Sequence, residues 1–348
     1  MSKLHADYYA DSMHQVESPL VRNEKIAEDT FLLRVDAPEI ASQVVPGQFV
    51  MIRLSHTDAP LIGRALAVYD VINEESGKPK WIDLVYLRKG AMTSALASLP
   101  LQTKVTVWGP LGNGFSNREC DHLVMVAGGI GQTPMLLLGR EALGSQTFGS
   151  PNRKNGWSDQ VTLIYGARRK GLLAGVSDFT DAGFDVHLCT DDGSEGEQKL
   201  VPEVLAEKLS AMASEVRVRV VTCGPEIMME KVAEICESAN VDCQVSMETP
   251  MACGIGICFH AWQKSNKMGQ SNGITNAPAL RAPSSIQKRF AGDRTTNRYY
   301  RKTRFEKNGF RVERWSVTAV RPSLAINNQL HLELCVCLPE KRTAGSGC

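Results

Sequence analysis

The stretch Leu123-Val124-Met125-Val126-Ala127-Gly128-Gly129-Ile130-Gly131-Gln132-Thr133-Pro134 decides the fold. Its apolar half predicts a buried strand, its glycines a tight turn, and its proline the first turn of a helix over 135–143. Glycines at a helix start let a pyrophosphate approach backbone N–H groups closely. The stretch therefore predicts a dinucleotide site whose candidate residues are Gly128, Gly129, Gly131, Thr133 and Pro134.

Strands and helices alternate around this stretch, from about residue 117 to 246. Apolar runs at 161–165, 186–189 and 216–222 predict strands, and 226–240 predicts a helix. Such alternation is typical of a parallel sheet with helices on both faces. We therefore expect a Rossmann-like NAD-binding domain over 117–246.

Ligands of open parallel sheets bind at the carboxyl ends of the strands. Cys223 stands at such an end, before Gly224 and Pro225, so it is a candidate to lie beside a nicotinamide, although a small buried thiol is the simpler explanation. Arg168 suits a nucleotide phosphate and an ordinary surface position equally well. Asp191 and Asp192 disfavour a 2′-phosphate if either faces the ribose, with Asp192 as the candidate cofactor residue, and the choice between NAD and NADP stays open.

Short apolar or alternating runs separated by Pro, Gly and Asp turns occupy about residues 18–116. The runs lie at 30–35, 48–54, 65–71, 81–86 and 104–108, with one predicted helix near 92–99. Many short strands with turn signals predict a small antiparallel barrel.

Two sites in this barrel have the chemistry of a cofactor contact. Arg64, followed by Ala65, Leu66 and Ala67, places a guanidinium at a strand start, where its planar fork suits a pyrophosphate. Gly90, Ala91 and Thr93 form a flexible turn before the predicted helix, which suits a phosphate. Each pattern alone is also typical of ordinary turns, and their order within one barrel favours the functional interpretation.

A glycine-rich loop, Met-Glu-Thr-Pro-Met-Ala-Cys-Gly-Ile-Gly-Ile-Cys-Phe, follows at 247–259. Cys253 and Cys258 stand in it with the C-x4-C spacing of a plant-type [2Fe–2S] site, whereas zinc knuckles usually show C-x2-C. The loop therefore predicts two ligands of an iron–sulfur cluster.

The composition is that of a globular protein with two to three domains: 348 residues, 43% apolar, 22% charged, net charge +1. Although the net charge is close to zero, the range 264–321 is strongly basic, since only Asp293, Glu306 and Glu313 are acidic there. No apolar segment follows Met1 and no run is long enough to span a bilayer, so we expect a cytoplasmic protein whose ten cysteines are thiols or metal ligands.

The barrel, the G-G-x-G-x-T-P loop and Cys-Gly-Pro together resemble the ferredoxin–NAD(P) reductase superfamily. With the loop at 247–259, the chain is similar to the electron-transfer subunits of NAD-dependent, type B dihydroorotate dehydrogenases, from about Ser18 to Phe259. The resemblance implies FAD on the barrel, in contact with Arg64, Ala65, Leu66, Ala67, Leu84, Val85, Tyr86, Gly90 and Ala91. Ala67 stands where the family usually has a Ser or Thr, and Ala91 stands where it usually has a Thr. Thr93, two residues further on, is a substitute for the second of these hydroxyl groups.

The resemblance also implies the reaction. A partner subunit would oxidise dihydroorotate on its FMN in pyrimidine biosynthesis, and electrons would pass through the [2Fe–2S] cluster and FAD of this chain to NAD⁺. The implied assembly is a heterotetramer of two such subunits and two catalytic subunits. The alternatives are a reductase subunit of an NAD(P)H–ferredoxin or sulfide dehydrogenase-type complex, and a non-catalytic or cluster-defective remnant with a basic tail.

After Phe259 the sequence departs from the family, which continues C-x4-C-x2-C and then a fourth Cys; Ala261 stands at the third position. One interpretation is an insertion, after which Cys335 and Cys348, with twelve residues between them, complete the cluster. The other is a shifted reading frame, because loss of one G from a coding sequence for Phe-Ala-Cys-Val yields Phe-His-Ala-Trp, as found at 259–262. The segment 247–348 is thus expected to be an iron–sulfur segment, interrupted or replaced by a basic, disordered stretch at about 260–334. That stretch carries aromatic residues suited to nucleic acid, but a basic segment without function is the simpler interpretation.

Overall fold

The computed structural model describes residues 13–55, 57, 60–247 and 251–255 with their side chains, and the backbone of strands at 280–281, 298–307, 310–319 and 332–337. The chain divides into two compact units, Met1–Ser284 and Ser285–Cys348. Among the described residues, no helix is both long and apolar enough to cross a bilayer.

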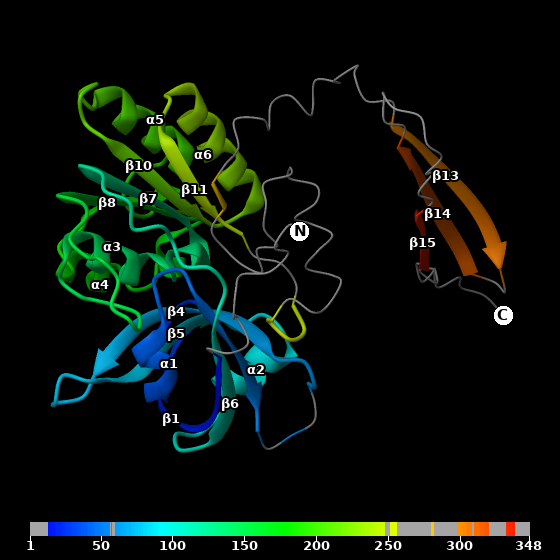
Figure 1. Cartoon of the computed structure of the whole chain (residues 1–348), viewed down its shortest axis with the longest axis horizontal. Coiled ribbons are helices and arrows are strands. Elements are labelled where there is room, and N and C mark those ends of the chain that lie inside the picture. The colour runs from blue at the N-terminus through cyan, green and yellow to red at the C-terminus, as the bar shows by residue number, and fades with distance from the viewer. Residues whose placement is uncertain are drawn as a thin grey trace. The chain divides into compact units, whose positions relative to one another are not determined.

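The first unit begins with a closed antiparallel barrel (Figure 1). Its strands follow the order β1-β2-β5-β4-β3-β6 around the barrel. They are β1 (His14–Ala27), β2 (Thr30–Asp36), β3 (Phe49–Leu54), β4 (Arg64–Asn73), β5 (Pro79–Leu87) and β6 (Lys104–Leu111). Helix α1 (Pro38–Gln43) connects β2 to β3, and α2 (Ala91–Ala97) connects β5 to β6. The barrel expected from the sequence is confirmed.

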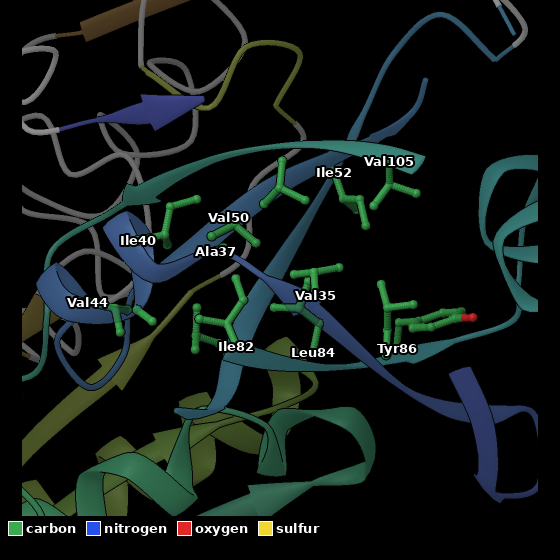
Figure 2. Packing of buried hydrophobic residues seen from close by; sticks show 14 of the residues in the cluster. Val35, Ala37, Ile40, Val44, Val50, Ile52, Ile82, Leu84, Tyr86 and Val105 are labelled. Carbon is green, nitrogen blue, oxygen red and sulfur yellow. The ribbon is translucent and has the colours of Figure 1, made fainter. Parts of the chain in front are cut away.

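Alternate residues of β2, β3, β5 and β6 fill the barrel (Figure 2). In β3, Val50 and Ile52 belong to this core, whereas Phe49 and Met51 lie in a separate apolar cluster on the opposite face of the strand. Ile40 of α1 adds to the core. Burying an aliphatic side chain contributes about 1.5–3 kcal/mol, so the two-residue periodicity of these strands determines which face of each points inward.

An α/β domain follows, with the sheet order β12-β11-β10-β7-β8-β9. Its strands are β7 (His122–Gly128), β8 (Gln160–Ala167), β9 (Asp185–Thr190), β10 (Val218–Cys223), β11 (Asp242–Ser246) and β12 (Leu280–Arg281). Only β12 pairs antiparallel in this described sheet. The predicted parallel, Rossmann-like sheet is therefore confirmed.

Helices cover both faces of this sheet (Figure 1). The short helix η1 (Gly129–Gln132), α3 (Met135–Leu143), η2 (Lys170–Leu172) and α4 (Val176–Asp181) lie in the first half of the domain, and α5 (Val201–Ala211) and α6 (Glu226–Ser238) in the second. Leu136 and Phe179, from α3 and α4, share one core with Tyr69 of the barrel. Leu205 and Val232, from α5 and α6, share the core of the other face.

The α3 face of the domain packs directly against the barrel. Arg140 Nη1 lies 2.6 Å from Asp70 Oδ1, and the hydroxyl of Tyr69 donates to Asp178 Oδ2 at 2.6 Å. Both barrel residues lie in β4, where a bulge at Tyr69 interrupts the register with β5. Strand β4 therefore connects the barrel to the α/β domain.

The second unit contains an antiparallel sheet in the order β13-β14-β15. Its strands are β13 (Arg298–Lys307), β14 (Phe310–Ala319) and β15 (Leu332–Cys337). Strands β13 and β14 lie within the range 260–334, for which the sequence indicated a basic, disordered stretch. The domain bounds proposed from the sequence stay predictions.

Candidate functional site

Strands β4 and β5 diverge beside the predicted FAD residues. Their pairing runs only from Val68 opposite Leu84 to Asn73 opposite Pro79. Before Val68, the β4 residues Arg64, Ala65, Leu66 and Ala67 pair only with β3, and after Leu84 strand β5 pairs only with β2, its partner along Trp81–Leu87. Among the described residues, the facing edges of these two segments thus have no ladder between them. They leave backbone donors and acceptors for a planar polar ligand, and the residues fit a flavin there.

The side chains around this gap differ in exposure. Arg64 and Ala65 are exposed, Leu66 and Ala67 half-buried, and the Arg64 guanidinium donates to the carbonyl oxygens of Ile62 and Gly63. Leu84, Val85 and Tyr86 are buried, with Tyr86 stacked on Phe31 at 5.7 Å between ring centroids. The β5 residues therefore offer a cofactor their backbone, whereas the β4 residues offer side chains as well.

The turn after β5 is closed by Thr93. Its Oγ1 accepts hydrogen bonds from the backbone N–H of Lys89 at 3.0 Å and of Gly90 at 3.1 Å, and lies 3.2 Å from the Gly90 carbonyl oxygen. Gly90 is the N-cap of α2, and a Cβ built on it meets nothing within 4 Å, so the space above the turn is open. Thr93 thus shapes this turn, and Ala91 is exposed beside it.

The glycine loop after β7 is packed as closely as the sequence implies. A Cβ at Gly131 would overlap the carbonyl oxygen of Cys223, and one at Gly128 would lie 2.7 Å from Met228 Sδ. Gly129 has φ +55°, in the left-handed region that favours glycine. Thr133 and Pro134 are buried, and Pro134 is the N-cap of α3. These contacts fix η1 at the carboxyl ends of β7 and β10.

A pocket of about 470 Å³ opens at this edge of the sheet. It is lined from the α/β domain by Gly128, Gly129, Gln132, Arg168, Asp191 and Pro225, among others, and from the barrel by Thr30 and Leu87. Thr30 and Leu87 are paired across β2 and β5. The pocket therefore reaches from the glycine loop to the strand that borders the β4–β5 gap.

Pro225 lines this pocket and directly follows Cys223 and Gly224 in the chain. Cys223 is 5% exposed at the end of β10. Gly224 has φ +156°, and a Cβ on it would lie 3.0 Å from Gly128 N. This close approach brings the two predicted nucleotide segments together, while the catalytic role of Cys223 stays a prediction.

Of the two neighbouring aspartates, Asp191 lines the pocket. Asp192 is exposed, and its Oδ1 accepts from Ser194 N at 3.0 Å and Ser194 Oγ at 2.6 Å, which lowers the pKa of the Asp192 carboxyl. The cofactor role assigned to Asp192 stays a prediction, and the structure places its neighbour nearer to the pocket. Sequence pattern does not distinguish two adjacent carboxylates, because the turn alone decides which one faces inward.

Several pocket residues carry no signal in the sequence. Lys199 and Lys231 add positive charge, although Lys199 is held by Glu197 and Glu207 at 2.9 and 2.7 Å. Burial raises the pKa of the Cys189 thiol to about 11, so this pocket thiol is protonated at neutral pH. These side chains come from segments that only tertiary folding brings to the glycine loop.

The loop that carries Cys253 is attached to the outside of the barrel. The indole Nε1 of Trp108 donates to the carbonyl oxygen of Cys253 at 2.9 Å. Gly254 has φ +78°, and Met251 and Ile255 pack on the cluster of Phe49, Met51 and Leu111. Cys253 itself is half-buried.

This attachment brings the Cys253 loop close to the predicted FAD residues. A Cβ on Gly63, the residue before Arg64, would lie 2.9 Å from Trp108 Cη2. Ala65 and Ala67 pair with Met51 and Phe49, so these four residues share one face of the sheet. Of the other proposed cluster ligands, Cys258 and Cys348 lie outside the described residues, and Cys335 is described only as backbone of β15 in the second unit. The described side chains include no group of three that could hold a metal ion.

Comparisons with known proteins agree with this architecture. Residues 17–115 match the family described as the oxidoreductase FAD-binding domain. The dihydroorotate dehydrogenase B (NAD(+)), electron transfer subunit, of Desulforamulus reducens is 31% identical over 247 residues, which cover 70% of this chain and 87% of the relative. The probable subunit of the same name from Pyrococcus abyssi is 35% identical over 217 residues, covering 62% and 72%. A solved NADH-dependent reduced ferredoxin–NADP oxidoreductase superposes with a TM-score of 0.61 at 24% identity, over 80% of this chain and 94% of the other.

Proposed function

Because the chain belongs to the family of electron-transfer subunits of NAD-dependent dihydroorotate dehydrogenase B, and is an oxidoreductase subunit with an FAD-binding domain, we propose that it carries electrons from dihydroorotate to NAD⁺. The oxidation of dihydroorotate, a step of pyrimidine biosynthesis, belongs to a partner subunit that holds FMN. The NADH-linked half of the reaction belongs to this chain.

One observation carries the proposal: the β4–β5 gap lies between the nucleotide pocket and the Cys253 loop. Leu87 lines the pocket at one border of the gap, and Gly63, which packs on Trp108, precedes the other. Bound FAD supplies the chemistry that joins single-electron carriers to hydride transfer. A flavin in this gap would have the nucleotide pocket at one border and the Cys253 loop at the other.

The residues of the chain have distinct tasks in this proposal. The backbone of Ala65–Ala67 and Val85–Tyr86 would orient the flavin, and Arg64 would bind its pyrophosphate. Gly128 and Gly129 would admit the nucleotide pyrophosphate to the start of η1. The buried residues Cys223 and Tyr165 would help to exclude water from the ring.

A [2Fe–2S] cluster at the Cys253 loop completes the proposed route. Cys253 and Cys258 would supply two thiolates, and Cys335 and Cys348 are the candidates for the other two. The fixed carbonyl of Cys253 and the left-handed turn at Gly254 fit a loop that holds a cluster ligand in place. The cytoplasmic location and the heterotetrameric assembly remain predictions from the sequence.

The test is anaerobic purification of the full chain, followed by analysis of FAD, iron and acid-labile sulfide, repeated on Cys335→Ser and Cys253→Ser. We expect FAD in all three proteins, and iron with sulfide only in the wild type. Iron that persists in Cys335→Ser would refute the split ligand set. FAD without iron in the wild type would leave a reductase domain disconnected from a dihydroorotate-oxidising partner, and the absence of FAD would refute the proposed function itself.

A further inference from the structure

Gln132 is a buried amide with no visible purpose in the fold. It ends η1, its relative exposure is 0%, and neither Oε1 nor Nε2 has a hydrogen-bond partner among the described residues. Buried carboxamides are almost always hydrogen-bonded, because an unpaired buried donor or acceptor costs free energy. An apolar side chain would pack here at a lower cost. The simplest partner for the Gln132 carboxamide is therefore a group outside the described residues.

The surroundings of Gln132 indicate what that group is. Gln132 lines the nucleotide pocket, and η1 lies against β5 of the barrel and β10 of the sheet. The preceding residue, Gly131, touches the carbonyl of Cys223 closely enough to exclude a Cβ. Gln132 therefore lies between the strand that borders the flavin gap and the strand that ends in Cys223.

Hydride transfer needs the nicotinamide ring in this same place, between the nucleotide loop and the flavin. The ring carries a carboxamide with one carbonyl acceptor and one NH₂ donor, which is complementary to the carboxamide of Gln132. Phosphate oxygens accept only, so a pyrophosphate would leave Gln132 Oε1 unpaired. We propose that the Gln132 carboxamide pairs with the nicotinamide carboxamide of NAD(H) and so positions the ring; this inference rests on the proposed function.

The same sheet offers a matched control. Thr222 is also fully buried, and its Oγ1 also lacks a partner among the described residues. Because side chains alternate along β10, Thr222 shares the face of Val220, which packs in the α5–α6 core, whereas Cys223 lies in the core of the other face. Thr222→Val therefore removes a comparable orphaned group from the face that does not meet the barrel.

The experiment compares wild type, Gln132→Met and Thr222→Val as full chains with FAD bound. Equilibrium binding is measured for NADH, for ADP-ribose, which lacks the nicotinamide, and for the 3-acetylpyridine analogue, which lacks the NH₂ donor. Gln132→Met should bind NADH about tenfold more weakly, since one buried hydrogen-bonded pair is lost, and ADP-ribose equally well. The wild-type preference for NADH over the analogue should shrink in Gln132→Met and persist in Thr222→Val.

Stability provides a second readout that needs no turnover. Without nucleotide, Gln132→Met should unfold at the same or a higher denaturant concentration than wild type, because an unpaired buried amide is removed. If Gln132 had a structural role instead, Gln132→Met would lower the stability and weaken the binding of NADH and ADP-ribose alike, and this result would overturn the inference. Unchanged NADH binding in Gln132→Met would also overturn it. A wild-type chain that binds neither NADH nor ADP-ribose would refute the proposed function together with the inference, whereas wild-type binding with an unchanged variant would refute the inference alone.

Discussion

At the scale of single residues, Asp70 shows how burial and pairing compete. Its Oδ1 accepts from Arg140 Nη1 at 2.6 Å and from Val71 N at 2.8 Å, and both bonds favour the charged form. Burial outweighs them and raises the pKa of Asp70 from 3.8 to about 6. The ion pair between the barrel and the α/β domain is therefore formed at the cost of desolvating the carboxylate.

This shift predicts a pH-dependent stability. Well below pH 3.8 Asp70 is protonated in both the folded and the unfolded chain. As the pH rises from there to about 6, the unfolded chain releases its proton first, so the folded state loses stability. Two pKa units correspond to about 3 kcal/mol as an upper value. Denaturant titrations of wild type and Asp70→Asn should show that, as the pH rises from 4 to 7.5, the unfolding free energy of the wild type falls relative to that of the variant by an amount of this order of magnitude. The loss of the Arg140 partner in Asp70→Asn is a pH-independent offset, and a difference that stays flat with pH would contradict the prediction.

At the scale of elements, the turn between β5 and α2 depends on one hydroxyl. Thr93 Oγ1 accepts hydrogen bonds from the N–H groups of Lys89 and Gly90 and thereby fixes the turn that joins β5 to α2. Helix α2 has seven residues, too few for a stable helix without such a cap. The geometry of this border of the β4–β5 gap therefore follows from the cap.

Removal of the cap should act on both stability and cofactor retention. Thr93→Val keeps the shape of the side chain but leaves two N–H groups without their acceptor, and should cost about 1 kcal/mol of unfolding free energy. It should also release FAD faster on dilution, measured by flavin fluorescence. The control is Ser94→Ala in the next, exposed position, which should stay within about 0.5 kcal/mol of wild type. Equal behaviour of the two variants would show that the cap does not shape the site.

At the scale of the whole molecule, the described residues proposed to contact the flavin and the nucleotide lie before residue 256. The barrel, the α/β domain and the Cys253 loop belong to the first unit, whereas Cys335 belongs to the second. The proposed reductase half is therefore separable from the proposed cluster.

A chain ending at Ile255 tests this separation. It should bind FAD and oxidise NADH with an artificial acceptor at a rate within about twofold of the full chain, since it keeps every described pocket residue. It should contain no iron, because Cys258 is absent. Loss of FAD from this shortened chain would mean that the later residues support the barrel.

Much of the architecture could be read from local sequence. Helix α3 has the bounds predicted from the sequence, 135–143, and the strand predicted at 123–127 lies inside β7. Both elements are specified locally, by an apolar run that is followed by glycines and a proline. Strands β1 and β11 and helix α5 were not predicted. β1 mixes charged and apolar residues and is stabilised by pairing with β2 and β6, and β11 by pairing with β10, which are contacts distant in sequence.

The sequence by itself determined the barrel, the parallel sheet and the glycine loop, since periodicity and turn residues act over a few positions. Only the tertiary structure decided that β4 and β5 separate before Val68, that Asp191 rather than Asp192 lines the pocket, and that Trp108 holds the Cys253 loop against the barrel. It also decided that Gln132 is buried with no hydrogen-bond partner among the described residues. These features arise from packing between segments far apart in the chain, and no local pattern encodes which of two such segments will meet.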